Sequence, residues 1–237
     1  MKTPAIHHVL AAGLALGAAL PVHAQAVQKA RTVTVQAKVN YLTFLPNSYS
    51  ANGAPVPLII FLHGSGERGS DLNKVKAWGP PAIAEKDPAF PFMVVSPQVP
   101  EGEWWHARLL KGMIDDVLAK YNVDRSRVYL TGLSMGGYGA WDLAISYPQY
   151  FAAVAPICGG GNTIRIRQMK DVPTWAFHGL KDDAVPEQES ARMVAALKAA
   201  GGNVQYTVLP EAGHVDAWVY AYGQAGLFDW FLSHRKQ

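Results

Sequence analysis

One stretch decides the fold class of this chain: Val128-Tyr129-Leu130-Thr131-Gly132-Leu133-Ser134-Met135-Gly136-Gly137. Residues 128–130 predict a buried strand, and residues 137–141 predict a helix that starts almost directly after the serine. Such an abrupt strand-to-helix turn strains the backbone at Ser134, and the flanking glycines leave room for it. The hydroxyl is then exposed at the edge of the sheet, near the positive end of a helix. The pattern favours a nucleophilic serine over one that merely caps the helix.

Apolar segments of strand length recur on both sides of this turn. They occupy residues 58–62, 92–95, 128–130, 152–155, 174–177 and 204–209, and residues 32–44 alternate as a half-buried strand would. Between them, apolar residues recur at helical spacing in 109–121 and 193–200, and a closing helix is expected at 227–231. Strands that alternate with helices predict an α/β fold with a mostly parallel sheet and helices on both faces.

A serine nucleophile needs a base, and the base needs an orienting acid. The loop after 174–177 contains His178-Gly179-Leu180-Lys181-Asp182-Asp183, and the loop after 204–209 contains Pro210-Glu211-Ala212-Gly213-His214. This is the serine, acid, histidine order expected of such folds. We therefore predict His214 as the base and one of the two aspartates as the acid, because neighbouring side chains on a tight loop point in different directions. His178 is interpreted as a brace for the acid loop.

A glycine-rich loop follows the most apolar strand, Leu62-His63-Gly64-Ser65-Gly66-Glu67-Arg68-Gly69. Backbone N–H groups of such a loop can hold the oxyanion of an ester transition state. We predict Met135 N–H as one donor and Ser65 N–H as the other, with Gly66 as the second choice for the loop donor. A nucleotide-binding turn is excluded because neither glycine-rich phosphate pattern is matched. Glu67 and Arg68 form either a surface pair, the favoured interpretation, or a contact that orders the loop.

Two tryptophans and one cysteine carry weaker signals. Trp104 and Trp105 precede His106 in a predicted loop, where they either contact substrate or cover the core. Cys158 is the single cysteine, which excludes an internal disulfide and a cysteine-based zinc site. It is interpreted as a small buried residue. No metal-ligand spacing occurs, and no cofactor is expected.

The composition predicts a folded protein with a large core. The chain has 237 residues, 49% hydrophobic and 16% charged, which excludes a disordered protein. A net charge of +3 without any lysine or arginine run implies no nucleic-acid partner. We find no repeat and no second domain, and residues 159–172 are too few for a large lid domain.

The first residues predict export. Lys2 precedes an apolar run at 9–20, and Val22-His23-Ala24 fits a small-x-small cleavage site. We expect a signal peptide at 1–24, a mature hydrolase domain at 25–237, and a periplasmic or secreted protein without a membrane partner. The alternative, a membrane anchor, needs a run of about 20 apolar residues. The sequence specifies no oligomeric state.

Several of these motifs resemble one family. The stretch 121–141, with 63–69, 155–161, 178–182 and Gly213-His214, resembles the α/β-hydrolase esterases known as predicted peptidases or phospholipase/carboxylesterases. That group is related to feruloyl, acetyl-xylan and polyhydroxybutyrate esterases. The resemblance implies an α/β-hydrolase fold and a catalytic triad of Ser134, Asp182 and His214. The family pattern His-Gly-x-x-Asp-x-x-Val-Pro, counted from His178, puts the acid at Asp182.

We therefore expect a secreted serine carboxylesterase that forms an acyl-enzyme and acts on short-chain, aryl or carbohydrate esters as small-molecule substrates. One alternative is a serine peptidase that uses the same triad on small peptides. Another is a non-catalytic binding protein on this fold, which the presence of all three triad residue types disfavours. A surface-active lipase is disfavoured because the chain has no lid-sized insertion.

Overall fold

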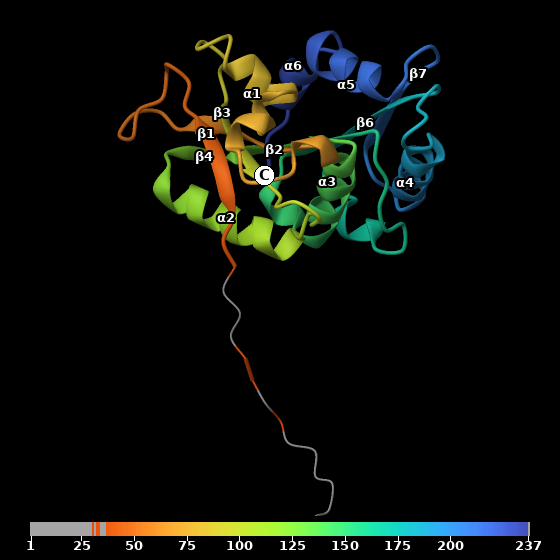
Figure 1. Ribbon diagram of the computed structural model, residues 1–237, viewed down its shortest axis with the longest axis horizontal. Coiled ribbons are helices and arrows are strands. Elements are labelled where there is room, and N and C mark those ends of the chain that lie inside the picture. Colours follow the sequence, from red (N-terminus) through yellow and green to blue (C-terminus); the bar gives the residue numbers. More distant parts are fainter. Residues whose placement is uncertain (1–29, 31, 34–36, 237) are drawn as a thin grey trace, which may run out of the picture. The chain divides into compact units, whose positions relative to one another are not determined.

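The computed structural model describes residues 30, 32–33 and 37–236, and in that part seven strands form one sheet (Figure 1). The strands are β1 (Asn40–Phe44), β2 (Val56–Leu62), β3 (Met93–Gln98), β4 (Val123–Leu133), β5 (Ala153–Ile157), β6 (Thr174–Gly179) and β7 (Val204–Leu209). Their order across the sheet is β1-β3-β2-β4-β5-β6-β7. Only β1 is antiparallel to its neighbour, so the loops after the parallel strands emerge at one edge.

Helices cover both faces of the sheet, as Figure 1 shows. They are α1 (Gly79–Ala84), α2 (Ala107–Lys120), α3 (Met135–Ser146), α4 (Gln188–Ala199), α5 (His214–Gly223) and α6 (Leu227–Leu232), with short 3-10 turns η1 (Ser65–Glu67), η2 (Leu72–Lys76), η3 (Pro148–Tyr150) and η4 (Ile166–Met169). Buried side chains of α2, α3 and α4 form one apolar cluster with the sheet. Those of α1, α5 and α6 form a second cluster on the other face. The predicted two-sided arrangement is confirmed.

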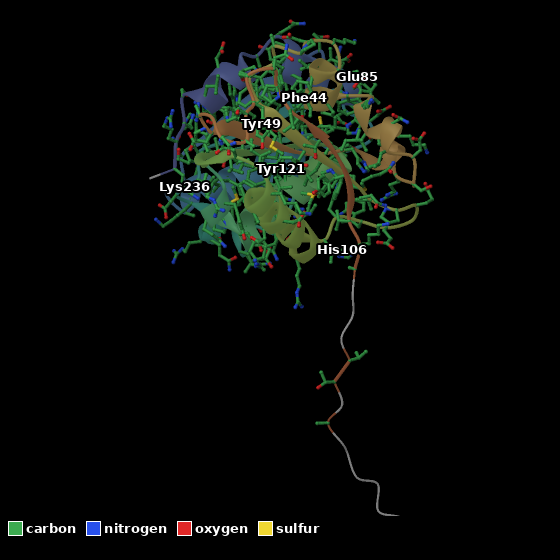
Figure 2. All side chains as sticks on the ribbon, turned by 90° about the vertical axis from the view of Figure 1, so that its left-hand side faces the viewer. Phe44, Tyr49, Glu85, His106, Tyr121 and Lys236 are labelled. Atoms are coloured by element: carbon green, nitrogen blue, oxygen red, sulfur yellow. The ribbon has the colours of Figure 1, made fainter. Side chains whose placement is uncertain are left out.

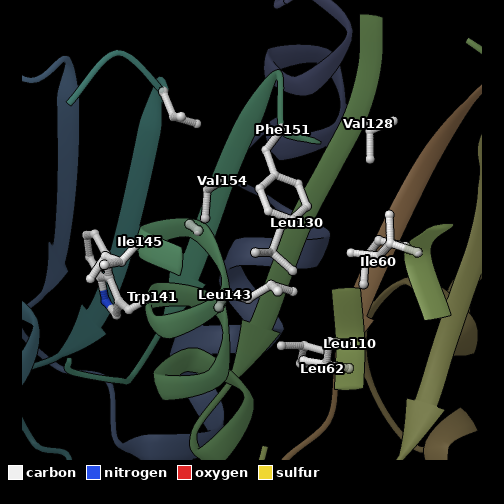
Figure 3. Close-up of a cluster of buried hydrophobic side chains, with 14 of the residues drawn as sticks. Ile60, Leu62, Leu110, Val128, Leu130, Trp141, Leu143, Ile145, Phe151 and Val154 are labelled. Atoms are coloured by element: carbon white, nitrogen blue, oxygen red, sulfur yellow. The ribbon is translucent and has the colours of Figure 1, made fainter. Parts of the chain in front are cut away.

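The central strands are apolar throughout because helices bury both of their faces. Every residue of β2 is buried, and so is every residue of β5. The larger cluster includes Leu143 of α3, Leu130 of β4 and Val154 of β5 (Figure 3). Each such aliphatic side chain contributes about 1.5–3 kcal/mol by leaving water. Charged and polar side chains such as those of Glu85, His106 and Lys236 are exposed at the surface (Figure 2).

The strand or hairpin arm predicted at 32–44 is shorter among the described residues than expected. Among the described residues of that segment only Asn40–Phe44 form a strand, and residues 37–39 have no regular structure. The reason is the length of the partner: Asn40 pairs with Gln98, the last residue of β3, so the ladder has nothing further to bond to. The expected signal peptide at 1–24 lies outside the described residues. Within them, no helix has the length and apolar character needed to cross a membrane.

Candidate active site

Ser134 lies at the junction of β4 and α3 with an unusual backbone. Its φ is 55° and its ψ is −120°, a conformation that residues with a side chain rarely adopt. The strained turn is held in place because the Ser134 N–H donates to the Ile157 carbonyl of β5 over 2.9 Å. Strain of this kind persists only where the surrounding structure fixes it, and it is common at functional sites.

The two glycines of the motif allow α3 to approach the sheet closely. A methyl group on Gly136 would lie 1.9 Å from the Leu62 carbonyl oxygen, and one on Gly132 would lie 2.3 Å from the Gly136 carbonyl oxygen. No other residue type fits at either position. The end of β2 is therefore packed directly against the turn that carries Ser134.

Ser134, His214 and Asp182 form a continuous chain of hydrogen bonds. The Ser134 Oγ is 2.9 Å from His214 Nε2, and His214 Nδ1 is 2.6 Å from Asp182 Oδ2. His214 is the first residue of α5, and Asp182 lies in the loop after β6. The Asp182 side chain is fully buried, whereas 15% of the His214 side chain is exposed. The structure thus brings together the three residues proposed from the sequence.

The Asp182 carboxylate is held as an anion. Its Oδ1 accepts hydrogen bonds from the N–H of Ala184 at 3.0 Å and of Val185 at 2.8 Å. Burial by itself would raise the pKa of Asp182, but the Val185 N–H, the His214 ring and the Ala184 N–H together hold that pKa below its usual value. The neighbouring Asp183 is exposed. A buried, fully bonded carboxylate suits a group that orients a histidine.

The glycine-rich loop lies beside the nucleophile. A methyl group on Gly64 would lie 3.7 Å from Ser134 Cβ. Met135 is the first residue of α3 and Ser65 is the first residue of η1, so neither N–H has a partner within its own helix. Gly66 follows inside η1. Met135 and Ser65 therefore present two backbone donors on the two elements that meet at Ser134.

Glu67 contributes to this loop rather than to a surface pair. Its carboxylate lies close to Gly64, where a methyl group would be 3.2 Å from Glu67 Oε2, and burial raises the pKa of Glu67. No ion pair joins it to Arg68 in the described part of the chain, which corrects the favoured interpretation from the sequence. The Arg68 guanidinium instead lies over the Trp104 ring, 5.6 Å from its centroid.

His63 fastens the loop to the rest of the protein. The Val99 N–H donates to its Nε2 over 3.1 Å, so the ring hydrogen is on Nδ1, which faces the Gly64 carbonyl. Burial of this ring is the main reason that its pKa is lowered to about 4. The Trp105 Nε1–H donates to the His63 carbonyl over 3.3 Å. His63 is thus a neutral anchor for the loop at neutral pH.

The two tryptophans have different environments. Trp105 is only 6% exposed, and its ring packs edge-on against His63 and against Gly139 of α3. Of the two alternatives given for Trp105, the structure favours the one in which it covers the core, because this side chain is buried beneath the loop. Trp104 is 49% exposed and lies edge-on to Tyr138, four residues beyond Ser134. It remains a candidate for contact with substrate.

An aromatic pair that the sequence analysis missed adjoins the histidine. Trp218 lies edge-on to the His214 ring with centroids 4.8 Å apart, and Trp78 lies edge-on to Trp218 at 5.9 Å. Both tryptophans line an apolar recess of about 310 Å³ together with Ile83 and Tyr222. The spacing of four residues between His214 and Trp218 could have revealed the contact, had a helix been expected there.

Cys158, His178 and Asp182 each place one potential metal-ligating atom within 4.8 Å of the others. All three groups are occupied otherwise. Asp182 binds His214 and two N–H groups, His178 Nε2 is 2.9 Å from the Val185 carbonyl, and burial raises the pKa of the Cys158 thiol far above its usual value. A protonated thiol is a poor ligand. The expected burial of Cys158 is confirmed.

A family model described as the dienelactone hydrolase family matches residues 24–217. The chain is 32% identical over 133 residues to poly(3-hydroxyalkanoate) depolymerase C of Paucimonas lemoignei, a match that covers 49% of this chain and 30% of that protein. It is 29% identical over 154 residues to the bifunctional acetylxylan esterase/xylanase XynS20E of Neocallimastix patriciarum, covering 62% and 22%. The matched part is therefore less than a third of either relative.

The solved structure of a thermostable esterase superposes with a TM-score of 0.76 at 32% identity. The match covers 84% of this chain and 60% of that one. These comparisons confirm the resemblance to α/β-hydrolase esterases that the motifs indicated, and they confirm the α/β-hydrolase fold.

Proposed function

Because the chain belongs to the dienelactone hydrolase family, we propose that it hydrolyses carboxylic esters with Ser134 as nucleophile, His214 as general base and Asp182 as orienting acid. The observation that carries the proposal is the unbroken chain of contacts, 2.9 Å from Ser134 to His214 and 2.6 Å from His214 to Asp182. In addition, the nucleophile Ser134 lies on a strained turn at the start of α3.

The mechanism follows from these positions. His214 Nε2 takes the proton of the Ser134 hydroxyl as the oxygen attacks the ester carbonyl. The negative charge that develops on the carbonyl oxygen is stabilised by the N–H groups of Met135 and Ser65. Protonated His214 then gives its proton to the departing alcohol, and water repeats the sequence on the acyl-enzyme. Asp182 keeps Nδ1 protonated throughout, which leaves Nε2 free to act as the base.

We infer that the substrates are short-chain, aryl or carbohydrate esters. Trp104 and Tyr138 form an aromatic wall on the nucleophile side, and the recess at Trp78 and Trp218 offers an apolar surface on the histidine side. The segment between β5 and β6 contains only η4 as regular structure, so nothing of lid size covers Ser134 from there. Both named relatives act on polymeric esters or sugar esters according to their names.

A substrate screen with matched variants tests the function. Purified protein is assayed on nitrophenyl esters of rising chain length, feruloyl and acetyl-xylan esters, and small peptides. Ser134→Ala should lower ester turnover by about 10⁴-fold or more, whereas Ser146→Ala at the far end of α3 should not change it. A serine-reactive phosphonate should label Ser134 alone. Near-normal turnover in Ser134→Ala, or a preference for peptides over every ester, would overturn the proposal.

We also propose that the protein is exported after cleavage behind Ala24. The proposal rests on the positive start, the apolar run at 9–20 and the small residues at Val22 and Ala24. Expression of the full chain in a bacterial host, followed by intact-mass measurement of periplasmic and medium fractions, should give a protein that starts at Gln25. Recovery of protein that still carries Met1 would contradict this.

A further inference from the structure

A second histidine lies on the acid side of the triad. His178 belongs to β6, its side chain is fully buried, and its Nε2 is 3.2 Å from Asp182 Oδ2, the same oxygen that meets His214. The triad mechanism assigns no role to this ring. A buried imidazole so close to the reacting groups needs an explanation, because polar groups are costly to bury unless they are bonded.

The hydrogen on His178 can be placed from its neighbours. Nε2 is 2.9 Å from the Val185 carbonyl oxygen and 3.2 Å from the Asp182 carboxylate. Both partners only accept hydrogen bonds, so Nε2 must carry a hydrogen. The geometry directs this hydrogen to the Val185 carbonyl, with the positive N–H dipole beside Asp182 Oδ2.

The other ring nitrogen ties the histidine to the scaffold. His178 Nδ1 is 2.7 Å from the Ser190 hydroxyl of α4, and that hydroxyl is 2.8 Å from the carbonyl of Gly159, which follows β5. Ser190 is fully buried as well. Whether the Ser190 hydroxyl donates to His178 Nδ1 or to the Gly159 carbonyl, His178 Nε2 still carries its hydrogen. One ring therefore connects β6, α4 and the loop after β5 to the acid loop.

Val185 links His178 to the triad through its own peptide groups. Its carbonyl accepts from His178, and its N–H donates to Asp182 Oδ1 over 2.8 Å. His178 therefore fixes the turn from Asp182 to Val185 through the Val185 carbonyl, and the Asp182 carboxylate fixes it through the Val185 N–H. Without the Nε2–H donor the Val185 carbonyl would be buried without this partner, and the turn would lose its fixed position.

We propose that His178 is a positioning residue for the triad acid: its Nε2–H holds the Asp182–Val185 turn so that Asp182 Oδ2 stays directed at His214 Nδ1. This inference rests on the proposed serine hydrolase function. His178 touches no substrate, and it acts through Asp182. Loss of the donor should therefore lower kcat and leave KM nearly unchanged, because orientation of the base matters in the transition state and not in substrate binding.

Three substitutions separate the two edges of the ring. His178→Gln can place an amide N–H where Nε2 was and should keep kcat within about fivefold of the wild type. His178→Asn reaches Ser190 but is too short for Val185, and His178→Leu removes both bonds. The His178→Asn and His178→Leu variants should each lower kcat by about 100-fold, the effect expected of a misplaced catalytic group.

The matched control is Thr174→Val, on the same strand. The Thr174 hydroxyl is buried and donates to the Val172 carbonyl. This bond lies at the start of β6, far from the acid loop, which follows the other end of the strand. Its loss should lower the melting temperature while kcat stays within about twofold of the wild type. The comparison is made well below the lowest melting temperature of the set, so that a loss of fold is not read as a loss of orientation.

A readout without substrate keeps the test independent of the proposed function. The short hydrogen bond between His214 Nδ1 and Asp182 should give a far-downfield proton signal in the NMR spectrum. We expect this signal in the wild type, His178→Gln and Thr174→Val, and its loss or upfield shift in His178→Asn and His178→Leu. If no ester is turned over by the wild type, the proposed function fails, and the proton signal still decides the role of His178.

Two results would overturn the proposal. One is a kcat for His178→Asn or His178→Leu equal to that of the Thr174→Val control, with the downfield signal intact. The other is a His178→Gln variant that is folded but no faster than His178→Asn, since the position of the donor would then be irrelevant.

Discussion

Asp182 and Asp183 are neighbours in the chain, yet only Asp182 faces His214. The Asp182 side chain is fully buried with its Oδ2 2.6 Å from His214 Nδ1, and Asp183 is exposed to solvent. The difference arises because Asp182 Oδ1 accepts the N–H groups of Ala184 and Val185, which turns its carboxylate inward. Two residues of identical chemistry can therefore be tested against each other.

Asp182→Asn should lower ester turnover by about 10⁴-fold, as the same change does in serine proteases, because an amide cannot keep Nδ1 of His214 protonated. Asp183→Asn should cost less than about tenfold, because this side chain is exposed. Steady-state kinetics of the two proteins at one pH provide the comparison. A larger loss at Asp183 would show that the acid was assigned to the wrong aspartate.

The two adjacent tryptophans should separate stability from substrate binding. Trp105→Ala should destabilise the fold by about 3–5 kcal/mol, because a buried ring is replaced by a cavity beneath the oxyanion loop. Trp104→Ala should leave the melting temperature close to that of the wild type and raise KM for aryl esters more than for acetyl esters. Denaturant unfolding and ester kinetics measure the two effects, and equal KM ratios for both ester classes would remove Trp104 from the substrate site.

Acid should destabilise the protein through His63. Its pKa is about 4 in the folded protein against 6.5 for a free histidine, so the unfolded chain binds more protons between these values. The free energy of unfolding should therefore fall as the pH falls from about 6.5 to 4, by about 3 kcal/mol from this residue.

His63→Gln should flatten that pH dependence, even though the variant is less stable at neutral pH. His106→Gln is the control, because His106 is exposed at the surface (Figure 2). Urea unfolding of the three proteins at several pH values gives the slopes. If the wild type and His63→Gln lose stability equally between pH 6.5 and 4, His63 is not buried in its neutral form.

The short segment between β5 and β6, which holds no lid-sized element, predicts the response to ester length. Short acyl chains should be hydrolysed faster than long ones, and the rate should not rise when a substrate passes its solubility limit. A lipase with a mobile cover would show the reverse, since its site opens at an interface. Initial rates across the solubility limits of acetate, butyrate and octanoate esters decide between the two.

Most of the fold and the three triad contacts could be anticipated from local patterns. The buried parallel strands are apolar on both faces, which makes them visible in the sequence, and the predicted segment 58–62 lies within β2. Ser134 was found because glycines are required on both sides of its turn. Asp182 could be separated from Asp183 only by the resemblance, since no periodicity distinguishes adjacent residues in a loop.

The features that were missed depend on tertiary contacts. α1 begins Gly79-Pro80-Pro81, which is typical of a loop, but proline is tolerated in the first turn of a helix. α5 starts at His214, and its contact with Trp218 follows only if the helix is recognised. Trp105 and Trp104 are the same residue type in the same loop, and only the packing against His63 shows which one is buried.

His63 also has a consequence for how such proteins can change. Because it bonds Gly64, Val99 and Trp105 at once, His63 links the segments that follow β2 and β3. Substitutions in either segment should therefore be strongly non-additive when combined, since each alters the support of the other. Evolution toward new esters would have to alter the two segments together.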